Sequence, residues 1–291
     1  MLSEQQNPRT HDIDRLPTLE ILRKINDEDR QVAEVVRTAL PAIAQAVDVI
    51  SEHIQNGGRL FYVGAGTSGR LGVLDASESV PTFGVEPGLI KGLIAGGDKA
   101  LMDSVEGAED DENAGRNDLL ALGLSAKDVV VGIAASGRTP YTLGAIEAAK
   151  EIGAVTIGLA CNDPSPLLER AQIKIGVPVG PEVVAGSTRL KAGTAQKLVL
   201  NMLSTASMIK LGKVYDNLMV DVQVTNNKLA HRARQIVSKI TGTSNQTARQ
   251  LLLETNNEVK TAIVVHLKGA TPQEARELLT SVNGRLRELI G

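Results

Sequence analysis

The chain has 291 residues, of which 42% are hydrophobic and only 2% aromatic, and its formal net charge is −3. A chain without a strong basic field is not built to bind nucleic acid or an anionic membrane surface, and so few aromatic side chains argue against stacking on single-stranded bases. Cys161 is the only cysteine, which excludes an internal disulfide and a thiolate metal cluster.

Targeting and metal-binding signals are also missing from the sequence. No apolar run approaches the roughly 20 residues that cross a bilayer, and the first residues lack the basic-then-apolar layout of a secretory signal. The four histidines are far apart in the chain and have no metal-ligand spacing. The sequence therefore predicts a cytoplasmic protein that uses no metal.

The N-terminal part reads as an arm followed by helices. Residues 1–16 are polar, and Thr18 begins a short amphipathic helix. Residues 29–55 carry apolar side chains near helical spacing, which predicts one longer helix. Gly57 and Gly58 end it, because glycine commonly terminates helices.

Five short apolar runs follow, and each leads into a turn and a helical stretch. This alternation predicts an α/β fold with a doubly wound parallel sheet and flavodoxin-like layers. In such sheets ligands bind beyond the carboxyl ends of the strands. The expected strands are residues 60–63, 92–95, 129–133, 155–159 and 173–175.

The C-terminal part is predicted to be helical, with helices over 188–211, 216–238, 244–256 and 271–289. The apolar run 259–267 fits a helix or a strand. We expect four parts: an N-terminal arm with helices (1–50), a sheet domain (51–215), a connecting helix (216–239) and a small helical C-terminal domain (240–291).

The first strand leads into residues 64–70, which read Gly-Ala-Gly-Thr-Ser-Gly-Arg. Backbone amides at the start of a helix attract anions, and glycines such as Gly66 let an anion come close. The spacing also fits a dinucleotide-binding turn, for which Asp98 would be the acidic residue after the second strand. The adjacent hydroxyls of Thr67 and Ser68 instead favour a phosphate monoester.

A second hydroxyl-rich turn, residues 136–140, follows the third expected strand. Ser136, Gly137, Arg138 and Thr139 would lie beside the first turn if both strand ends meet at one edge of the sheet. Two such turns converging on one group predict a phosphate site. Each hydroxyl taken alone also fits a simple helix cap.

With these turns the sequence resembles sugar-isomerase (SIS) domain proteins, and within them the N-acetylmuramic acid 6-phosphate etherase family. The resemblance runs from about residue 7 to the C-terminal helices. The family often has Cys-Pro where this chain has Ser79-Val80, and this difference leaves the preceding Glu78 in place. The matching stretches are residues 64–70, 74–78, 105–110, 135–141, 186–194 and 217–221.

The resemblance implies an enzyme that converts N-acetylmuramic acid 6-phosphate and water to N-acetylglucosamine 6-phosphate and D-lactate during bacterial cell-wall recycling. It implies a homodimer and no cofactor. The implied chemistry opens the sugar ring to an aldehyde, removes the C2 proton, expels lactate from C3 and adds water there. Such a scheme needs a base and an acid, and two carboxylates in different environments are able to supply both.

The resemblance assigns these roles to Glu78, as proton donor to the lactyl oxygen, and to Glu109, as the group that moves the C2 proton. From the residues alone, Glu109 lies in an acidic turn that also fits the first turn of a helix. Glu182, Ser187 and Lys191 are expected at the same substrate site. Glu182 would assist ring opening or bind a hydroxyl, and Lys191 would bind an anionic group unless it is an ordinary solvated lysine.

Two other functions use the same features. An aldose–ketose phosphosugar isomerase needs the same phosphate site and one carboxylate between C1 and C2. A non-catalytic sugar-phosphate sensor, as in the related vertebrate glucokinase regulatory proteins, would bind without turnover. The joint presence of Glu78 and Glu109 in their motifs favours the etherase over both.

Overall fold

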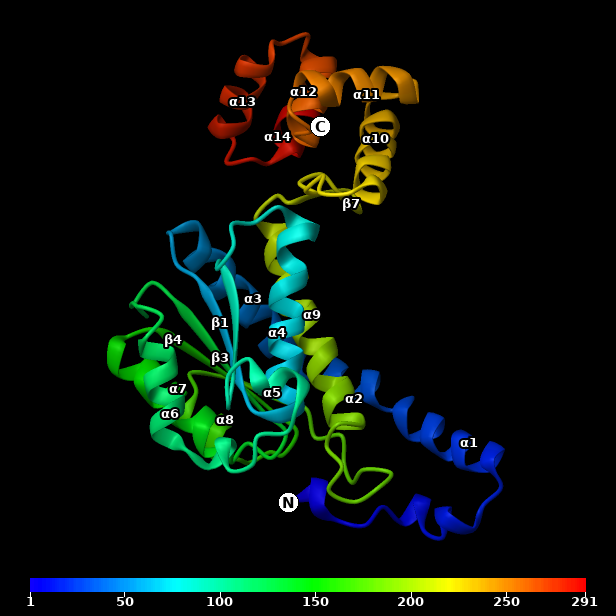
Figure 1. The fold of residues 1–291 in the computed structure, drawn as a ribbon, viewed down its shortest axis with the longest axis vertical. Coiled ribbons are helices and arrows are strands. Elements are labelled where there is room, and N and C mark those ends of the chain that lie inside the picture. The colour runs from blue at the N-terminus through cyan, green and yellow to red at the C-terminus, as the bar shows by residue number, and fades with distance from the viewer. The chain divides into compact units, whose positions relative to one another are not determined.

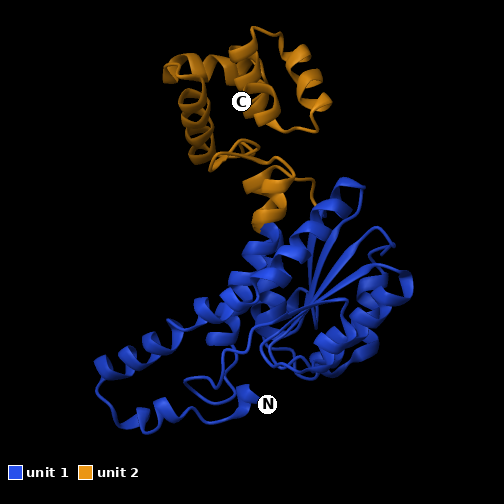
Figure 2. Ribbon diagram, turned by 180° about the vertical axis from the view of Figure 1, so that it is seen from behind, with its two compact units in different colours: residues 1–77, 88–204 blue, residues 78–87, 205–291 orange.

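The computed structural model describes residues 1–291. The chain forms two compact units, the first of Met1–Ser77 with Gly88–Ser204 and the second of Glu78–Pro87 with Thr205–Gly291 (Figure 2). This division differs from the predicted domain limits at residues 215 and 240. Val220 and Val222 are buried in the same apolar cluster as the C-terminal helices, and this packing assigns the connecting segment to the second unit.

The first unit contains a five-stranded parallel sheet, as the sequence predicts (Figure 1). The predicted fold class is therefore confirmed. The spatial order of the strands is β2-β1-β3-β4-β5. The strands are β1 (Leu60–Gly64), β2 (Ile90–Ile94), β3 (Val129–Ala134), β4 (Val155–Ala160) and β5 (Ile173–Gly176).

Helices cover both faces of this sheet, so its central strands are buried throughout. Parallel strands with two covered faces read as continuous apolar runs, which is why β1 and β3 are easy to find in the sequence. On one face Phe61 and Val130 pack with Ile146 and Leu167. The helices between the strands are α4 (Gly66–Phe83), α5 (Lys99–Met102), α6 (Glu112–Leu120), α7 (Pro140–Ile152) and α8 (Pro166–Arg170).

An ion pair fixes the start of β1 beside the start of β3. The buried carboxylate of Asp128 accepts hydrogen bonds from the backbone N–H and the guanidinium of Arg59, at 2.8 to 3.2 Å, and from Ser125. Burial alone would raise the pKa of Asp128, but the hydrogen bonds from Arg59 and Ser125 outweigh it and hold the pKa below its usual range. A buried carboxylate that accepts this many hydrogen bonds holds the starts of the two strands firmly together; we call this contact the Arg59–Asp128 clamp.

The N-terminal segment is more broken than predicted. Three short 3₁₀ turns (Leu2–Glu4, Pro8–Thr10 and Ile13–Arg15) precede α1 (Thr18–Asp29). The prediction of a single helix over 29–55 is wrong, because α2 (Val32–Thr38) ends before α3 (Leu40–Gln55) begins. Pro41 lies in the first turn of α3, and its missing N–H and rigid ring favour a helix start there.

The C-terminal half also departs from prediction in two places. Residues 214–219 form a two-stranded hairpin, and α10 (Asn227–Thr241) begins only after Asn226, whose side chain accepts a hydrogen bond from the Leu229 N–H. The helix expected over 271–289 breaks at Asn283 and Gly284, which both have positive φ. Residues 259–267, for which the sequence fits a helix or a strand, form a helix.

The remaining elements follow in chain order. They are α9 (Lys191–Lys210), β6 (Val214–Tyr215), β7 (Leu218–Met219), α10 (Asn227–Thr241), α11 (Asn245–Glu254), α12 (Val259–Lys268), α13 (Pro272–Ser281) and α14 (Leu286–Ile290).

Candidate active site

The two hydroxyl-rich turns lie side by side at the carboxyl edge of the sheet. β1 and β3 pair in parallel with Gly64 opposite Ile133, so the segments that follow them leave the sheet at the same level. The strand order changes direction between these two strands, with β2 on one side of β1 and β3 on the other. In open α/β sheets this point is where ligands bind.

The first turn is tight and short of space. Gly66 has φ +52°, and a Cβ at Gly64 would lie 2.9 Å from the Gly69 nitrogen. The buried Ser68 hydroxyl donates its proton to the Gln196 side-chain oxygen at 3.0 Å. Because a hydroxyl has one proton, Ser68 joins α4 to α9 in this structure, whereas the Thr67 hydroxyl makes no hydrogen bond within the chain.

The second turn combines backbone and hydroxyl groups. The Ser136 hydroxyl accepts a hydrogen bond from the Arg138 N–H at 3.1 Å. Thr139 occupies the N-cap position of α7, but its side chain makes no capping bond, so this hydroxyl is not used as a helix cap. Gly137 has φ +66°, and a Cβ there would lie 2.3 Å from the buried Ser165 hydroxyl oxygen. Only glycine fits at this position.

Glu109 lies close to the first turn. Glu109 and Gly66 line one cavity of about 310 Å³ in the first unit. Glu109 is exposed and sits on a short 3₁₀ turn, whereas the neighbouring Asp111 caps α6 by accepting from the Ala114 N–H. Of the acidic run, Asp111 caps α6 and Glu112 faces Arg170 at 3.4 Å, whereas Glu106 and Glu109 line the cavity.

A guanidinium supports the wall of this cavity. Arg70 donates to the backbone carbonyls of Leu101 and Asp103 at 3.2 and 3.1 Å. Its donors hold the segment between β2 and Glu109, so Arg70 acts as a brace here. Arg138, on the second turn, is exposed and has no ion pair.

Glu182 and Lys191 both make hydrogen bonds inside the protein. The fully buried Glu182 carboxylate accepts from the backbone N–H groups of Lys191 and Ala192, each at 2.9 Å, and so caps α9. Lys191 is 1% exposed, and its ammonium donates to Glu28 at 2.7 Å. Their expected roles toward substrate stay predictions, since these contacts use the groups for structure.

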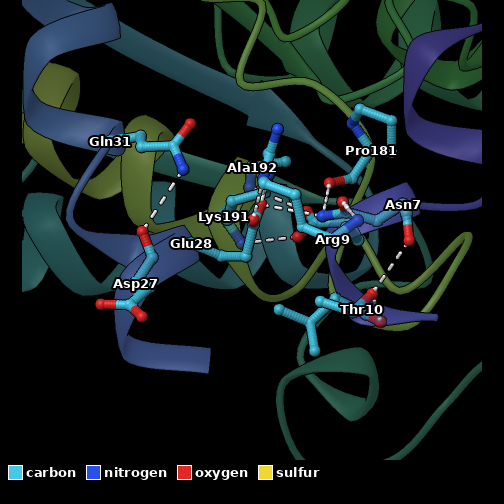
Figure 3. A network of polar contacts seen from close by, with 11 residues as sticks. Asn7, Arg9, Thr10, Asp27, Glu28, Gln31, Pro181, Lys191 and Ala192 are labelled. Atoms are coloured by element: carbon cyan, nitrogen blue, oxygen red, sulfur yellow. Dashed lines mark hydrogen bonds and ion pairs between the residues drawn. The ribbon is translucent and has the colours of Figure 1, made fainter. Parts of the chain in front are cut away.

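Glu28 is a residue that sequence reasoning missed. Its buried carboxylate also pairs with the Arg9 guanidinium and accepts from the Asn7 amide at 2.8 Å (Figure 3). The hydrogen bond from Arg9 is the main cause that lowers the pKa of Glu28 to about 2, with Lys191 and Asn7 acting in the same direction against burial. The start of α9 is thereby tied to the N-terminal arm.

Glu78 belongs to the second unit, on the last turns of α4, and its side chain is exposed. The cavity that contains Glu109 and Gly66 lies wholly in the first unit. Ser187 is half-buried in the loop before α9, and its backbone N–H donates to the Val184 carbonyl. The joint action of Glu78 and Glu109 therefore stays a prediction.

The structure gives no sign of a nucleophilic cysteine, a metal-binding cluster or a membrane-spanning helix. Cys161 is buried after β4, and burial is the main cause that raises the pKa of its thiol to about 12, so it is no nucleophile. No three His, Cys, Asp or Glu side chains gather as a metal ion would require. None of the helices is long and apolar enough to span a membrane.

Family models match three stretches of the chain. Residues 42–150 match the N-terminal SIS domain of glucokinase regulatory protein, and residues 111–206 match the SIS domain. Residues 216–260 match the C-terminal lid domain of glucokinase regulatory protein. These matches span both turns and extend into the second unit.

Curated relatives match along the whole chain. N-acetylmuramic acid 6-phosphate etherases of Yersinia pestis (strain Pestoides F) and Yersinia pseudotuberculosis serotype O:1b (strain IP 31758) are each 56% identical over 287 residues, which is 99% of this chain and 97% of theirs. A solved phosphoheptose isomerase from Francisella tularensis has a TM-score of 0.54 at 22% identity, covering 67% of this chain and 100% of its own. This structural likeness shows the fold.

We predict that Glu28→Gln destabilises the fold, because it leaves the buried Lys191 ammonium without its counterion. The loss should be about 3–5 kcal/mol at pH 7 in urea unfolding. The Glu28 pKa is depressed from 4.5 to about 2. Its contribution of about 3 kcal/mol is therefore fully present above pH 4.5 and disappears as pH falls toward 2.

The control is Glu20→Gln, which changes an exposed carboxylate on the same helix. The stability difference between wild type and Glu28→Gln should shrink between pH 5 and pH 3, and the Glu20 variant should show little difference at either pH. A gap for Glu28→Gln that stays constant across this range would show that the carboxylate charge does not stabilise the fold.

Proposed function

The chain belongs to the N-acetylmuramic acid 6-phosphate etherase family, and we propose that it cleaves the D-lactyl ether of N-acetylmuramic acid 6-phosphate to give N-acetylglucosamine 6-phosphate and D-lactate. The observation that carries this proposal is 56% identity over 99% of the chain. The activity is that of a carbon–oxygen lyase in peptidoglycan amino-sugar recycling, and the chemistry needs no cofactor.

The 6-phosphate would bind between the two turns at the β1–β3 edge. The backbone N–H groups at the start of α4, with Gly66 and the Thr67 hydroxyl, would donate from one side. Ser136 and Thr139 would donate from the other, since the second turn has a free hydroxyl and a serine whose oxygen only accepts at present. Helix starts and hydroxyl donors are suited to a phosphate dianion.

The reaction would proceed on the opened sugar. The carbonyl at C1 acidifies the C2 proton, a base removes it, and the electrons form an enolate. Collapse of the enolate makes a C2–C3 double bond and breaks the C3–oxygen bond, and an acid protonates the departing lactate oxygen. Water then adds at C3, and a proton returns to C2.

We assign the C2 proton transfer to Glu109 and the proton donation to lactate to Glu78. The position of Glu109 beside Gly66 supports its role, because one cavity would hold the phosphate end and the base within the length of a sugar. The role of Glu78 rests on its motif, residues 74–78. Both side chains are exposed and make no ion pair, which leaves them free to exchange protons.

Glu182, Ser187 and Lys191 have supporting roles in this proposal. Glu182 and Lys191 would fix the start of α9 next to the first turn, where a Cβ at Gly193 would lie 3.4 Å from the Thr67 methyl carbon. Ser187 would contact substrate from the preceding loop. The first unit would be the sugar-phosphate-binding domain, and the second unit would be a separate, mainly helical domain.

A homodimer and a cytoplasmic location complete the proposal. The helix α1 exposes Leu19 and Leu22 at 58% and 56% of their surface, an arrangement that a second copy would cover. A phosphorylated cell-wall sugar is a substrate of the cell interior, and the single buried thiol suits a reducing compartment.

The two carboxylates should be separable by isotope exchange. In deuterated water, Glu78→Gln should lose lactate release by at least about 100-fold while deuterium still enters C2 of the substrate. Glu109→Gln should lose both lactate release and C2 exchange. Loss of exchange in both variants, or lactate release at the normal rate in Glu78→Gln, would contradict the assigned roles.

Ser136→Ala should weaken binding of substrate and of inorganic phosphate together, by about 1.5–3 kcal/mol if the hydroxyl donates to the charged group. Isothermal titration with the inactive Glu78→Gln protein as background measures both ligands. Ser125→Ala serves as the control, because Ser125 bonds to Asp128 away from the turns. Equal phosphate affinity in the two serine variants would show that Ser136 only shapes its own turn.

Leu19→Lys combined with Leu22→Lys should convert the dimer to a monomer in sedimentation velocity, because buried ammonium groups oppose apolar contact. Glu20→Lys, at an exposed position between them, should leave the dimer unchanged. A wild-type protein that sediments as a monomer would reject the homodimer, and a dimer that survives both leucine changes would reject this surface.

A further inference from the structure

A cavity in the second unit has no part in the proposed reaction. It has a volume of about 720 Å³ and lies between the segment after β7 and the helices α12 and α13. Three cationic and two anionic side chains line it: Lys213, Lys260, Arg276, Asp221 and Glu258. The cavity therefore carries an excess of one positive charge.

The excess positive charge belongs to the cluster of Lys213, Lys260 and Asp221. Arg276 and Glu258 pair with one another at 2.8 Å and neutralise each other. By contrast, a single oxygen of Asp221 faces both ammonium groups, at 2.6 Å from Lys260 and 3.2 Å from Lys213. One carboxylate thus serves two cations.

The burial of Lys260 disfavours its positive charge, yet its ammonium stays paired with Asp221. The Lys260 side chain is only 8% exposed, and burial is the main cause that lowers its pKa, with the charge of Lys213 adding to the effect. An ammonium has three N–H donors, so each lysine keeps donors beyond its bond to Asp221. Gly284 lies close to Lys260: a Cβ at Gly284 would be 3.5 Å from the Lys260 nitrogen.

The cavity also contains uncharged polar groups. Gln223, Thr225, Asn256 and Asn257 also line the cavity, and their side chains make no hydrogen bonds within the chain. Amide and hydroxyl groups that share a cavity with two ammonium ions make its lining rich in donors. Such a set matches a ligand that offers several acceptor oxygens and a negative charge.

We propose that the cavity at Lys213 and Lys260 binds a small oxyanion, either a carboxylate or a phosphate. The ligand would sit between the two ammonium groups on the side away from Asp221 and would balance the unpaired charge. This site is separate from the proposed phosphate turns, which belong to the first unit. It would let a small anion, such as the carboxylate product D-lactate, stabilise the second unit.

The test measures the thermal midpoint of the full chain against sodium phosphate and, separately, sodium D-lactate, with sodium chloride keeping the ionic strength constant. Lys213→Met removes the excess charge and leaves the Lys260–Asp221 pair intact. Its apparent affinity for the oxyanion should fall roughly tenfold or more, the effect of losing one charge-assisted hydrogen bond. Lys268→Met, an exposed lysine at the end of the same α12, should bind as wild type does.

A second variant separates binding from a purely structural role. Asp221→Asn removes the competing carboxylate, so its thermal midpoint should fall without anion and should recover with oxyanion more than that of wild type. Crystals soaked in tungstate should show the ion within reach of both lysine nitrogens. A response to D-lactate alone or to phosphate alone identifies which oxyanion the site takes.

Two outcomes would overturn the proposal. One is equal affinity of Lys213→Met and Lys268→Met for both anions, because the lysine pair would then serve only to anchor Asp221. The other is tungstate bound elsewhere with no ion at the lysine pair. Neither readout uses turnover, so the result stands apart from the etherase assignment.

Discussion

The parallel pairing of β1 with β3 is the constraint on which the candidate site depends. These strands are separated by more than 60 residues in the chain, yet Leu60 lies opposite Val129 and Gly64 opposite Ile133. The Arg59–Asp128 clamp at the amino ends fixes this register before either strand begins. Because helices cover both faces of the sheet, a slip of one residue would move every side chain into the packing on the opposite face, so the register is strongly specified and both turns leave the sheet together.

The acidic side chains divide into two groups by their surroundings. Glu28, Asp128 and Glu182 are buried, and fixed N–H donors occupy their oxygens. The hydrogen-bonding capacity of a carboxylate held in this way is used by the fold itself, so these residues support the structure. Glu78 and Glu109 are exposed and have no such donors, so their carboxylates are free to contact a ligand. The sequence alone does not separate the groups, because each residue is simply a glutamate or aspartate near a turn.

Local patterns predicted the central strands well because β1 and β3 are buried on both faces and read as apolar runs. They failed where a distant partner or a backbone feature decided the outcome. The break in the expected 271–289 helix comes from positive φ at Asn283 and Gly284. Lys191 looked like a solvated lysine or an anion ligand because its counterion, Glu28, is 163 residues away in the chain. Likewise, the Ser68–Gln196 bond depends on how α9 packs beside α4, which periodicity does not reveal.

The two proposed anion sites would balance negative charge in different ways. Near the proposed phosphate turns, Arg70 donates to backbone carbonyls and Lys191 pairs with Glu28, which leaves Arg138 as the exposed cation of the second turn. Charge there would be balanced mainly by backbone dipoles and hydroxyls, which orient a phosphate without a tight ionic grip. This suits a product that must leave after each turnover. In the second unit, two ammonium groups share Asp221, so the excess of charge is built into side chains. A site of that kind favours retention of an anion, and the contrast argues that the two cavities have different tasks.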